Sequence, residues 1–400
     1  MSGSIANAFK RAENDASYLD CADLISRASP VDPVYLFCRQ RLQQRAHLFL
    51  DHFPGQVSYA VKANPETRVL RTLCQLGLQH FDVASLDEIA RVANCCPDAE
   101  LHFNNPVKAE QSIAEAYAHY GVRSFALDEA SELEKIGRCT AGDPSVTYTV
   151  RFKLDHAGAA YDFGSKFGAC PDRAVQLLRS IDALGARAAL TFHPGSQCTD
   201  PVMYTRYIEA AAGILQRSGA AVRFLNVGGG FPEHYPGTEL PAMEHYFRTI
   251  DAASQQFLGG TIALMCEPGR GMTARAASLL TRVIHVRDCG VSVFINDGVY
   301  GGMQEQSLID LQLPVKAWRE GTPLQGQAQA YRIFGPTCDP VDKLARETLL
   351  PRGLRAGDYI EFGMLGAYGS ATSTSFNGFS PGSYVDVLRA TEFSLQGTSD

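Results

Sequence analysis

The chain has 400 residues, of which 45% are hydrophobic and 20% charged, and its formal net charge is −7. This composition is typical of a globular protein, and the acidic balance argues against nucleic acid or an anionic membrane as the main partner. The first twenty residues lack the apolar run of a secretion signal, and no run of 18 apolar residues occurs, so we expect a cytoplasmic protein that binds a small molecule.

Eleven cysteines are scattered along the chain, with no C-x-x-C pair and no Cys/His spacing typical of zinc sites. Such a set indicates free thiols in a reducing compartment. We therefore predict no metal ligands.

Short apolar runs alternate with helical patterns through the first two thirds of the chain. About eight strands that alternate with helices are the count expected of a (β/α)8 barrel. The runs predicted as strands are Val34–Phe37, Val57–Val61, Phe81–Ala84, Leu101–Phe103, Ser124–Leu127, Val146–Phe152, Ala189–Phe192, Phe224–Val227 and Ala263–Cys266.

After about residue 275 the pattern changes to β-branched runs separated by Gly, Pro and Asp, which predicts a second, all-β domain. We expect residues 1–35 to join that domain, 36–275 to form the barrel and 276–400 to form the β domain. The strands expected there include Val283–Val286, Val291–Ile295, Asp358–Phe362 and Tyr384–Leu388.

Lys62 follows the run Val57–Val61 and precedes Asn64-Pro65, which ends the strand with a turn. The carboxyl ends of barrel strands are where such folds place their chemistry, and a partly desolvated lysine there can form a Schiff base. The alternative is a surface lysine whose stem packs on apolar groups.

Two further strand ends carry groups suited to anions. Gly228, Gly229 and Gly230 offer backbone N–H groups that can surround an anion, although an ordinary tight turn has the same composition. Glu267 and Arg270 follow another strand, and Arg suits phosphate while Glu suits a protonated ring nitrogen. A surface ion pair is the alternative.

A fourth strand end carries His193 and Ser196, where an imidazole can stack on a flat cofactor and a hydroxyl can reach its phosphate. A structural histidine is the alternative. Together, the lysine, histidine, glycine loop and Glu/Arg pair are what pyridoxal phosphate requires, since its aldehyde condenses with lysine and its pyridine nitrogen is kept protonated by a carboxylate. We predict this cofactor and an amino-acid substrate.

The chain resembles the fold type III pyridoxal-phosphate amino-acid decarboxylases, and most closely the ornithine decarboxylases. The resemblance implies a TIM-like barrel with a C-terminal β-sandwich or barrel domain, and decarboxylation of L-ornithine to putrescine in polyamine biosynthesis. Lysine or an unusual diamino acid stays open as substrate. The matching motifs are Tyr59–Pro65, Phe81–Ser85, Asn105-Pro106, Lys166–Gly168, Cys266–Arg270, Asn296–Gly301, Phe334–Asp339, Gly366–Tyr368 and Ser375–Gly378.

The resemblance also implies residue roles. Lys62 would be the Schiff-base lysine, with His193 against the ring face and Glu267 at the pyridine nitrogen. Further cofactor contacts are implied for Asp82, Glu88, Arg151, Ser196, Gly228, Gly229, Gly230, Gly269, Arg270 and Tyr368.

Cys338 and Asp339 would enter the site from the second subunit of a head-to-tail homodimer, with Cys338 as the acid that protonates the α-carbon. Lys166 and Asp342 match a pair near the subunit contact. A buried structural thiol at Cys338 and a plain exposed aspartate at Asp310 are the alternatives. Substrate contacts are implied for Asp310, Asp339, Tyr300 and Phe376.

Two loops depart from the family pattern. His193–Gln197 reads His-Pro-Gly-Ser-Gln where His-Val-Gly-Ser-Gly is usual. Because Pro194 fixes φ and Gln197 lacks glycine's access to positive φ, we expect a shifted loop. Gly301–Glu305 also differs from the usual sequence, so both loops could mark altered substrate choice.

Three rival readings remain. A decarboxylase of an unusual diamino acid in specialised metabolism would look much like this chain. A racemase would share the barrel and Lys62 but use a tyrosine in place of the cysteine. A non-enzymatic homologue that binds a regulator should have lost Lys62 or the phosphate-binding groups, which are all present here.

Overall fold

The computed structural model describes residues 17–154, 166–379 and 382–394. The chain forms two compact units. The barrel unit comprises Leu42–His234 and Thr238–Thr273, and the sheet unit comprises Met1–Arg41, Tyr235–Gly237 and Ala274–Asp400. Residues 1–16 of the predicted N-terminal segment lie outside the described residues.

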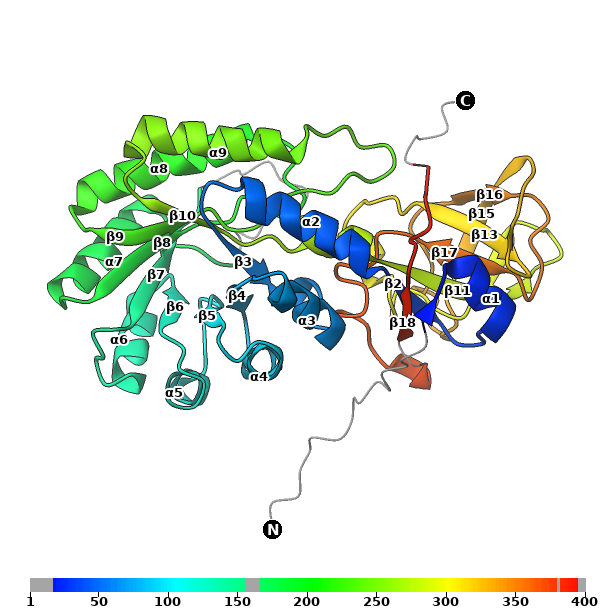
Figure 1. Cartoon of the computed structure of the whole chain (residues 1–400), viewed down its shortest axis with the longest axis horizontal. Coiled ribbons are helices and arrows are strands. Elements are labelled where there is room, and N and C mark those ends of the chain that lie inside the picture. Colours follow the sequence, from blue (N-terminus) through cyan, green and yellow to red (C-terminus); the bar gives the residue numbers. More distant parts are fainter. Residues whose placement is uncertain (1–16, 155–165, 380–381, 395–400) are drawn as a thin grey trace, which may run out of the picture. The chain divides into compact units, whose positions relative to one another are not determined.

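Eight parallel strands, counted within the described residues, close the barrel unit in the order β10-β3-β4-β5-β6-β7-β8-β9 (Figure 1). Each begins within two residues of a predicted apolar run, so the (β/α)8 barrel is confirmed. The strands are β3 (Gln56–Ala60), β4 (His80–Val83), β5 (Glu100–Phe103), β6 (Ser124–Leu127), β7 (Thr147–Arg151), β8 (Arg187–Thr191), β9 (Val222–Asn226) and β10 (Ala263–Cys266).

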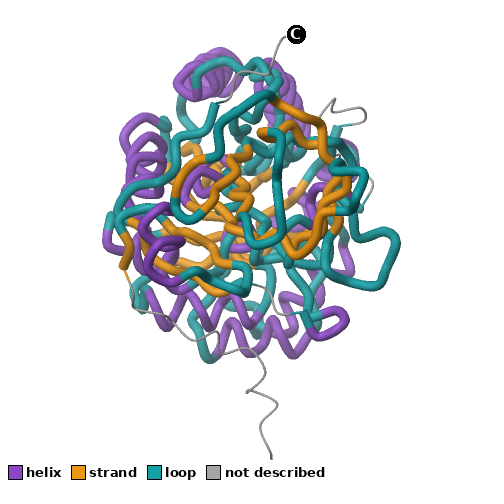
Figure 2. The backbone as a smooth tube through the Cα atoms, turned by 90° about the vertical axis from the view of Figure 1, so that its right-hand side faces the viewer, coloured by secondary structure: helices purple, strands orange, loops and turns teal. Residues whose placement is uncertain are grey.

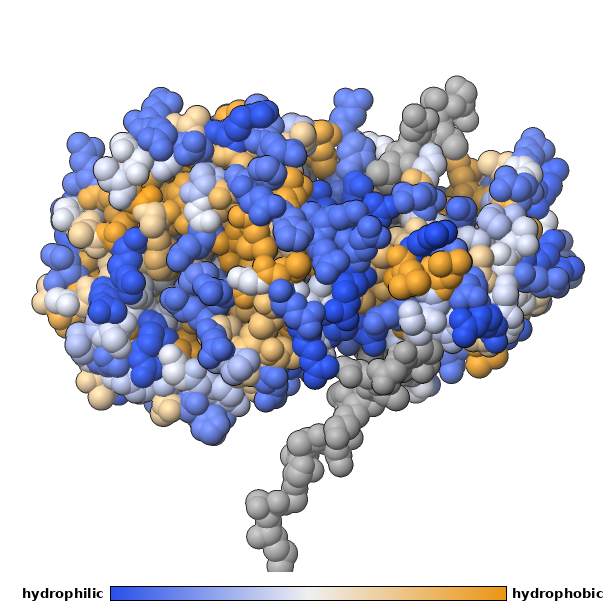
Figure 3. Space-filling view, in the orientation of Figure 1, coloured by the Kyte–Doolittle hydropathy of each residue, from blue (hydrophilic) through white to orange (hydrophobic). Residues whose placement is uncertain are grey.

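Helices lie outside the strands (Figure 2). In α2, Leu42, Ala46 and Phe49 are buried at helical spacing, whereas its outer face is hydrophilic (Figure 3). No helix in the described ranges is long and apolar enough to cross a membrane. The helices of the barrel region are α2 (Arg39–His52), α3 (Thr67–Gln75), α4 (Leu86–Cys95), α5 (Glu110–Ala118), α6 (Ala130–Cys139), α7 (Pro171–Ala183), α8 (Val202–Ser218), α9 (Met243–Leu258) and α10 (Arg270–Thr273).

The sheet unit contains, in its described residues, a ten-stranded mixed sheet whose main path runs β1-β18-β2-β11-β12-β15-β16. The sheet branches, because β17 pairs with both β11 and β13, and β13 pairs with β14. The predicted β domain is confirmed, and α1 (Cys21–Ala28) belongs to the same unit. The strands are β1 (Ser17–Tyr18), β2 (Val34–Phe37), β11 (Ala277–Val286), β12 (Ser292–Ile295), β13 (Val315–Arg319), β14 (Thr322–Pro323), β15 (Ala328–Phe334), β16 (Thr348–Pro351), β17 (Tyr359–Phe362) and β18 (Ser383–Val387).

β2 explains why the N-terminal stretch belongs to this sheet. It pairs antiparallel with β11 and parallel with β18, and all four of its residues are buried. The predicted boundary between residues 35 and 36 cuts this strand, whereas the structure keeps it whole in the sheet unit. Both of its partners lie far along the chain, so its own sequence could not reveal them.

Candidate active site

A pocket of about 270 Å³ opens at the carboxyl ends of the barrel strands, where parallel barrels carry their binding groups. The structure brings seven of the predicted residues together in its lining. They are Lys62, Asp82, Glu88, Arg151, Lys166, His193 and Glu267.

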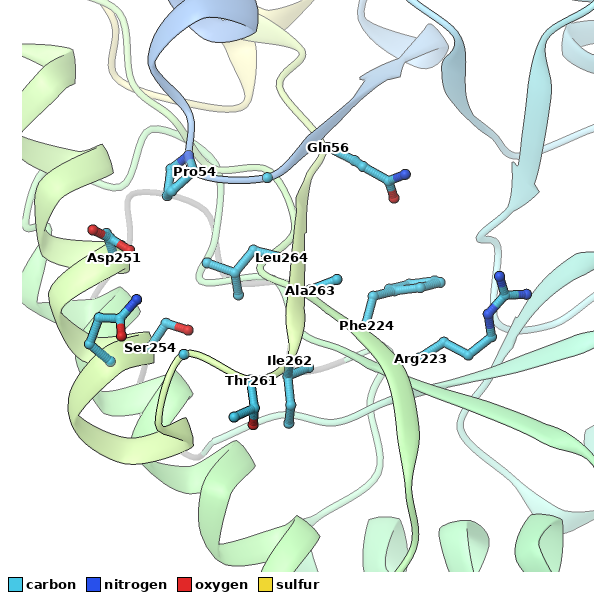
Figure 4. A pocket seen from close by; sticks show the side chains of 13 residues that line it. Pro54, Gln56, Arg223, Phe224, Asp251, Ser254, Thr261, Ile262, Ala263 and Leu264 are labelled. Carbon is cyan, nitrogen blue, oxygen red and sulfur yellow. The ribbon is translucent and has the colours of Figure 1, made fainter.

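A larger cavity, of about 590 Å³, lies at the amino ends of β3, β9 and β10 (Figure 4). Pro54 precedes β3 there, Phe224 comes from β9, and Asp251 and Ser254 come from α9. Its described lining contains none of the predicted site residues. Chemistry rather than size therefore identifies the candidate site.

Lys62 stands just beyond the end of β3. The strand stops at Ala60, one residue earlier than predicted, and Val61–Ala63 form a 3-10 turn closed by the Asn64 N–H donating to the Val61 carbonyl at 3.0 Å. The Tyr59 hydroxyl donates to the Asn64 carbonyl, also at 3.0 Å. This turn fixes the backbone of Lys62 while its side chain is exposed toward the pocket.

Glu88 has a structural task besides its place in the pocket. The Ser85 hydroxyl caps α4 by accepting from the Glu88 N–H at 3.2 Å, and the Glu88 carboxylate accepts from the Ala84 N–H at 2.7 Å. This Ser-x-x-Glu pairing resembles a capping box and holds the loop after β4. Burial raises the pKa of Glu88 to about 7.

Glu267 is buried and held by two amides. Its Oε1 accepts from Nδ2 of Asn104 at 2.6 Å and from Nδ2 of Asn226. Burial raises the pKa of Glu267 to about 8, and the negative charge of Asp82 adds to the rise while the positive charge of Lys62 opposes it. Burial also raises the pKa of Asp82. A protonated ring nitrogen beside Glu267 would favour its ionised form.

Sequence reasoning missed Asn104 and Asn226. Asn104 directly follows β5, and Asn226 is the last residue of β9, so both are polar residues at the end of a strand. That position is the signal that singled out Lys62, and it was available for the two asparagines as well.

His193 follows β8 and lies against the glycine loop. Its Nδ1 accepts from the Gly195 N–H at 3.0 Å, which assigns the ring proton to Nε2. Burial lowers the pKa of His193, so the ring is neutral. A Cβ added to Gly229 would lie 3.0 Å from the His193 Nε2 and 2.7 Å from the Glu267 carbonyl oxygen. The ring therefore needs glycine at this position.

Close packing restricts the other two glycines of this loop as well. A Cβ on Gly228 would lie 2.1 Å from the Phe192 carbonyl oxygen, and one on Gly230 would lie 2.5 Å from that of Gly195. Ser196 lies in the loop after β8. In the same loop, the Cys198 N–H donates a hydrogen bond to the Gly230 carbonyl. Gly269 precedes α10, and Arg270 begins that helix in a buried position. Phosphate binding by these groups stays a prediction.

We expected Gln197, unlike glycine, to avoid a positive φ, and this expectation is wrong. Gln197 has a φ of 55°, and its buried side chain compensates for the strained backbone. The amide Nε2 donates to the Glu233 carbonyl at 2.5 Å, and Oε1 accepts from the Glu233 N–H at 3.0 Å. Arg45 pairs with the Glu233 carboxylate at 3.3 Å. The loops after β8 and β9 are thus fastened together.

Four predicted residues form a second cluster, in the sheet unit. The Tyr300 hydroxyl donates to the Asp339 carboxylate at 2.6 Å, and the Tyr300 and Phe376 rings lie 4.5 Å apart between centroids. Cys338 is exposed, and its backbone N–H and its Sγ donate to Oδ1 of Asn377 at 3.2 and 3.3 Å. The alternative of a buried thiol is therefore wrong. The Tyr300 hydrogen bond lowers the pKa of Asp339, which stays ionised.

Asp342 shapes the loops that carry this cluster. Its buried carboxylate accepts from the Val299 N–H at 2.9 Å and from the Thr337 hydroxyl at 2.7 Å. A Cβ on Gly298 or Gly335 would lie 2.1 or 2.2 Å from its Oδ1. The carboxylate thus fills the space between the Gly-Val-Tyr and Gly-Pro-Thr-Cys segments. Its predicted role at a subunit contact stays a prediction.

Asp310 and Tyr368 lie in the sheet unit, whereas Lys166 lies in the barrel unit. Asp310 is exposed and pairs with Arg346, a partner that the sequence did not reveal. Tyr368 lies in the sheet unit with a φ of 56°. Lys166 lines the barrel pocket, with its ammonium 4.9 Å from the centroid of the Phe167 ring.

The barrel pocket suits pyridoxal phosphate by its donor set. It offers an amine at Lys62, which directly follows β3, a flat neutral ring at His193 and a buried carboxyl at Glu267. The glycine loop beside His193 has no space for side chains, so its backbone can approach an anion closely.

Glu267→Gln is expected to flatten the dependence of stability on pH in the cofactor-free protein. The folded carboxyl, with a pKa of about 8, keeps a proton that the unfolded chain loses above 4.5. Stability contributed by Glu267 is therefore present at low pH and lost as the pH rises between these values. Calorimetric unfolding midpoints should fall more steeply for the wild type than for the variant over this range, and parallel slopes would contradict the assignment.

Comparisons with known proteins converge on one family. Residues 39–274 match the family model described as "Pyridoxal-dependent decarboxylase, pyridoxal binding domain". The chain is 32% identical to the ornithine decarboxylase of Panagrellus redivivus over 86% of this chain and 82% of that protein. It is 30% identical to the lysine/ornithine decarboxylase of Selenomonas ruminantium over 89% of this chain and 87% of that protein. The crystal structure of the Paramecium bursaria Chlorella virus arginine decarboxylase superimposes with a TM-score of 0.80 at 28% identity, covering 92% of this chain and 98% of that one.

Proposed function

Since the chain belongs to the pyridoxal-dependent decarboxylases, we propose that it removes the α-carboxylate of L-ornithine to give putrescine and CO2, a step of polyamine biosynthesis. It is a pyridoxal-phosphate-dependent carboxy-lyase that acts on a basic amino acid. The cluster in the sheet unit supports a diamino acid, and the choice of ornithine among diamino acids rests on the likeness to ornithine decarboxylases.

The bound cofactor supplies an electron-accepting ring that stabilises negative charge at the α-carbon when CO2 leaves. In this chain, Lys62 would hold the cofactor covalently at the mouth of the barrel. Glu267, fixed by two amides, would keep the ring nitrogen protonated. His193 would cover one ring face and exclude water from it.

One observation carries the choice of a diamino acid: the hydrogen bond from Tyr300 to Asp339 beside the Cys338 thiol. It keeps the Asp339 carboxylate ionised and oriented, as binding of a distal ammonium requires. The adjacent Cys338 Sγ–H can give its proton to the α-carbon. Asp310 would be a second contact only if the ammonium competes with Arg346 for it.

The two clusters lie in different units, and we propose that the Cys338 cluster of one copy completes the barrel pocket of a second copy in a homodimer. The exposure of Cys338 supports this arrangement, since a thiol that acts on a partner's substrate must lie at the surface of its own chain. Each dimer would then contain two composite sites.

Ornithine is expected to give putrescine when the protein is assayed with pyridoxal phosphate. The panel would add lysine, arginine, diaminopimelate and 2,4-diaminobutyrate, with amines identified by mass spectrometry. One methylene is worth about 1–3 kcal/mol in a pocket, so ornithine should exceed lysine by about 10–200-fold in kcat/KM.

Asp339→Asn is the matched variant for this assay. Loss of one charge-assisted hydrogen bond should raise the KM for ornithine by about 10–100-fold. Asp310→Asn, tested beside it, shows whether the aspartate paired with Arg346 also binds the substrate. If none of the five amino acids yields an amine although the cofactor is bound, the substrate assignment is wrong.

A further inference from the structure

Three metal-ligating side chains converge inside the barrel, at the end of the strands away from the Lys62 pocket. Nδ1 of His80 lies 3.2 Å from Nε2 of His102 and 3.6 Å from the Glu100 carboxylate. One ligand atom from each of the three residues lies within 4.8 Å of the others.

From this geometry we propose that His80, His102 and Glu100 bind a divalent first-row transition metal, with zinc as the best fit. Two ligands bound at about 2.05 Å to a tetrahedral zinc ion lie about 3.3 Å apart, and the two measured separations bracket that value. Two imidazoles and one carboxylate are a common zinc donor set with an open fourth position.

Strand register explains why the ligands meet. His80 on β4 is in register with Glu100 on β5, and His102 stands two residues further along β5. Side chains two residues apart share one face of a strand, so all three face the same way. That face is the barrel interior, because Asp82, two residues after His80, lines the pocket there.

Two buried serine hydroxyls come from strand positions next to the proposed metal ligands. Ser58 on β3 is in register with His80, and Ser124 on β6 is in register with His102. Both are at least nine-tenths buried, and their hydroxyls have no hydrogen-bond partner among the residues that the structure describes. Such groups indicate a polar interior in which a metal-bound water would find acceptors and donors.

A hydrogen bond between His80 and His102, without a metal ion, explains only part of this geometry. A single proton on Nδ1 of His80 can bridge to His102 or to Glu100 but not to both. A cation at the centre satisfies all three lone pairs.

The site is also reachable. The side chain of Glu100 is 65% exposed, so an ion can enter from solvent. The His102 ring packs edge-on against Phe224, which lines the larger cavity at the same end of the barrel (Figure 4).

The test is titration of the full-length protein, treated first with a chelator, with Co2+ and then with Zn2+. We expect one equivalent of Co2+ per chain with visible bands of nitrogen and oxygen ligation and without thiolate charge transfer, which separates this site from the cysteines. Zn2+ should displace the Co2+ and raise the unfolding midpoint.

His80→Ala and Glu100→Gln should each weaken Co2+ binding at least tenfold. Glu100→Gln is the safer variant because the residue is exposed and its loss spares the core. His47→Ala is the matched control, since His47 pairs with Asp51 on the surface of α2 and is not one of the three proposed ligands, and it should bind like the wild type. Binding that is unchanged in His80→Ala and Glu100→Gln, or that shows thiolate bands only, would overturn the proposal.

Discussion

Replacing Cys338 with alanine is expected to lower the rate of amine formation by about 10²–10⁴-fold, the usual worth of a positioned proton donor. The thiol is exposed and lies beside an ionised carboxylate, so it can deliver a proton to a substrate that Asp339 holds. Cofactor binding should be unchanged, because Lys62 and Glu267 belong to the other unit. Steady-state assays of putrescine together with the absorbance of bound cofactor separate the two effects.

Cys289→Ala is the control for this prediction, since Cys289 is another exposed thiol of the sheet unit, on the segment between β11 and β12. It should behave like the wild type. Cys338→Ser would keep the size of the side chain with a weaker acid, and we expect it to fall between the alanine variant and the wild type. Wild-type amine formation by Cys338→Ala would exclude the thiol as the acid.

Lys62→Ala is expected to reduce activity to background, and mixing it with Cys338→Ala is expected to restore part of it. If each site combines the barrel pocket of one copy with the Cys338 cluster of another, a mixed dimer holds one intact site and one doubly damaged site. Equal amounts that reassort freely give half mixed dimers, so about a quarter of the wild-type activity should return.

The control for this experiment is a mixture of Lys62→Ala with the double variant Lys62→Ala/Cys338→Ala, which offers no intact composite site. It should stay inactive. Subunit exchange should be verified by native mass spectrometry of differently tagged copies. Exchange without recovery of activity would mean that each site is built within a single chain.

Much of the fold follows from local sequence. Apolar runs separated by helical patterns predicted the barrel, and the rule that binding groups gather at carboxyl ends placed Lys62, His193 and Glu267 in one pocket. The predicted boundary divided β2 because its hydrogen-bond partners, β11 and β18, lie more than 200 residues further along the chain. Strand type is a local property, whereas strand pairing is not.

Contacts between side chains that are distant in sequence could not be predicted from the sequence. Arg346 lies 36 residues after Asp310 in an irregular stretch, with no periodicity to connect them. His80 and His102 are far apart in sequence, and only strand register brings them together, which spacing rules for local motifs do not cover. The φ of Gln197 depends on an amide contact with Glu233, which residue type alone does not encode.

The division of the chain has a consequence for biosynthesis. The barrel is inserted into the sheet unit, and β18 lies between β1 and β2 in the sheet. A ribosome releases β1 and β2 first and β18 more than 300 residues later, whereas the barrel strands emerge in an unbroken series. The nascent barrel can therefore form while its two preceding strands still expose unsatisfied edges. The edge of β2 that pairs with β11 can be satisfied once Ala277–Val286 has emerged, whereas the edges of β1 and β2 that pair with β18 stay open until Ser383–Val387 emerges.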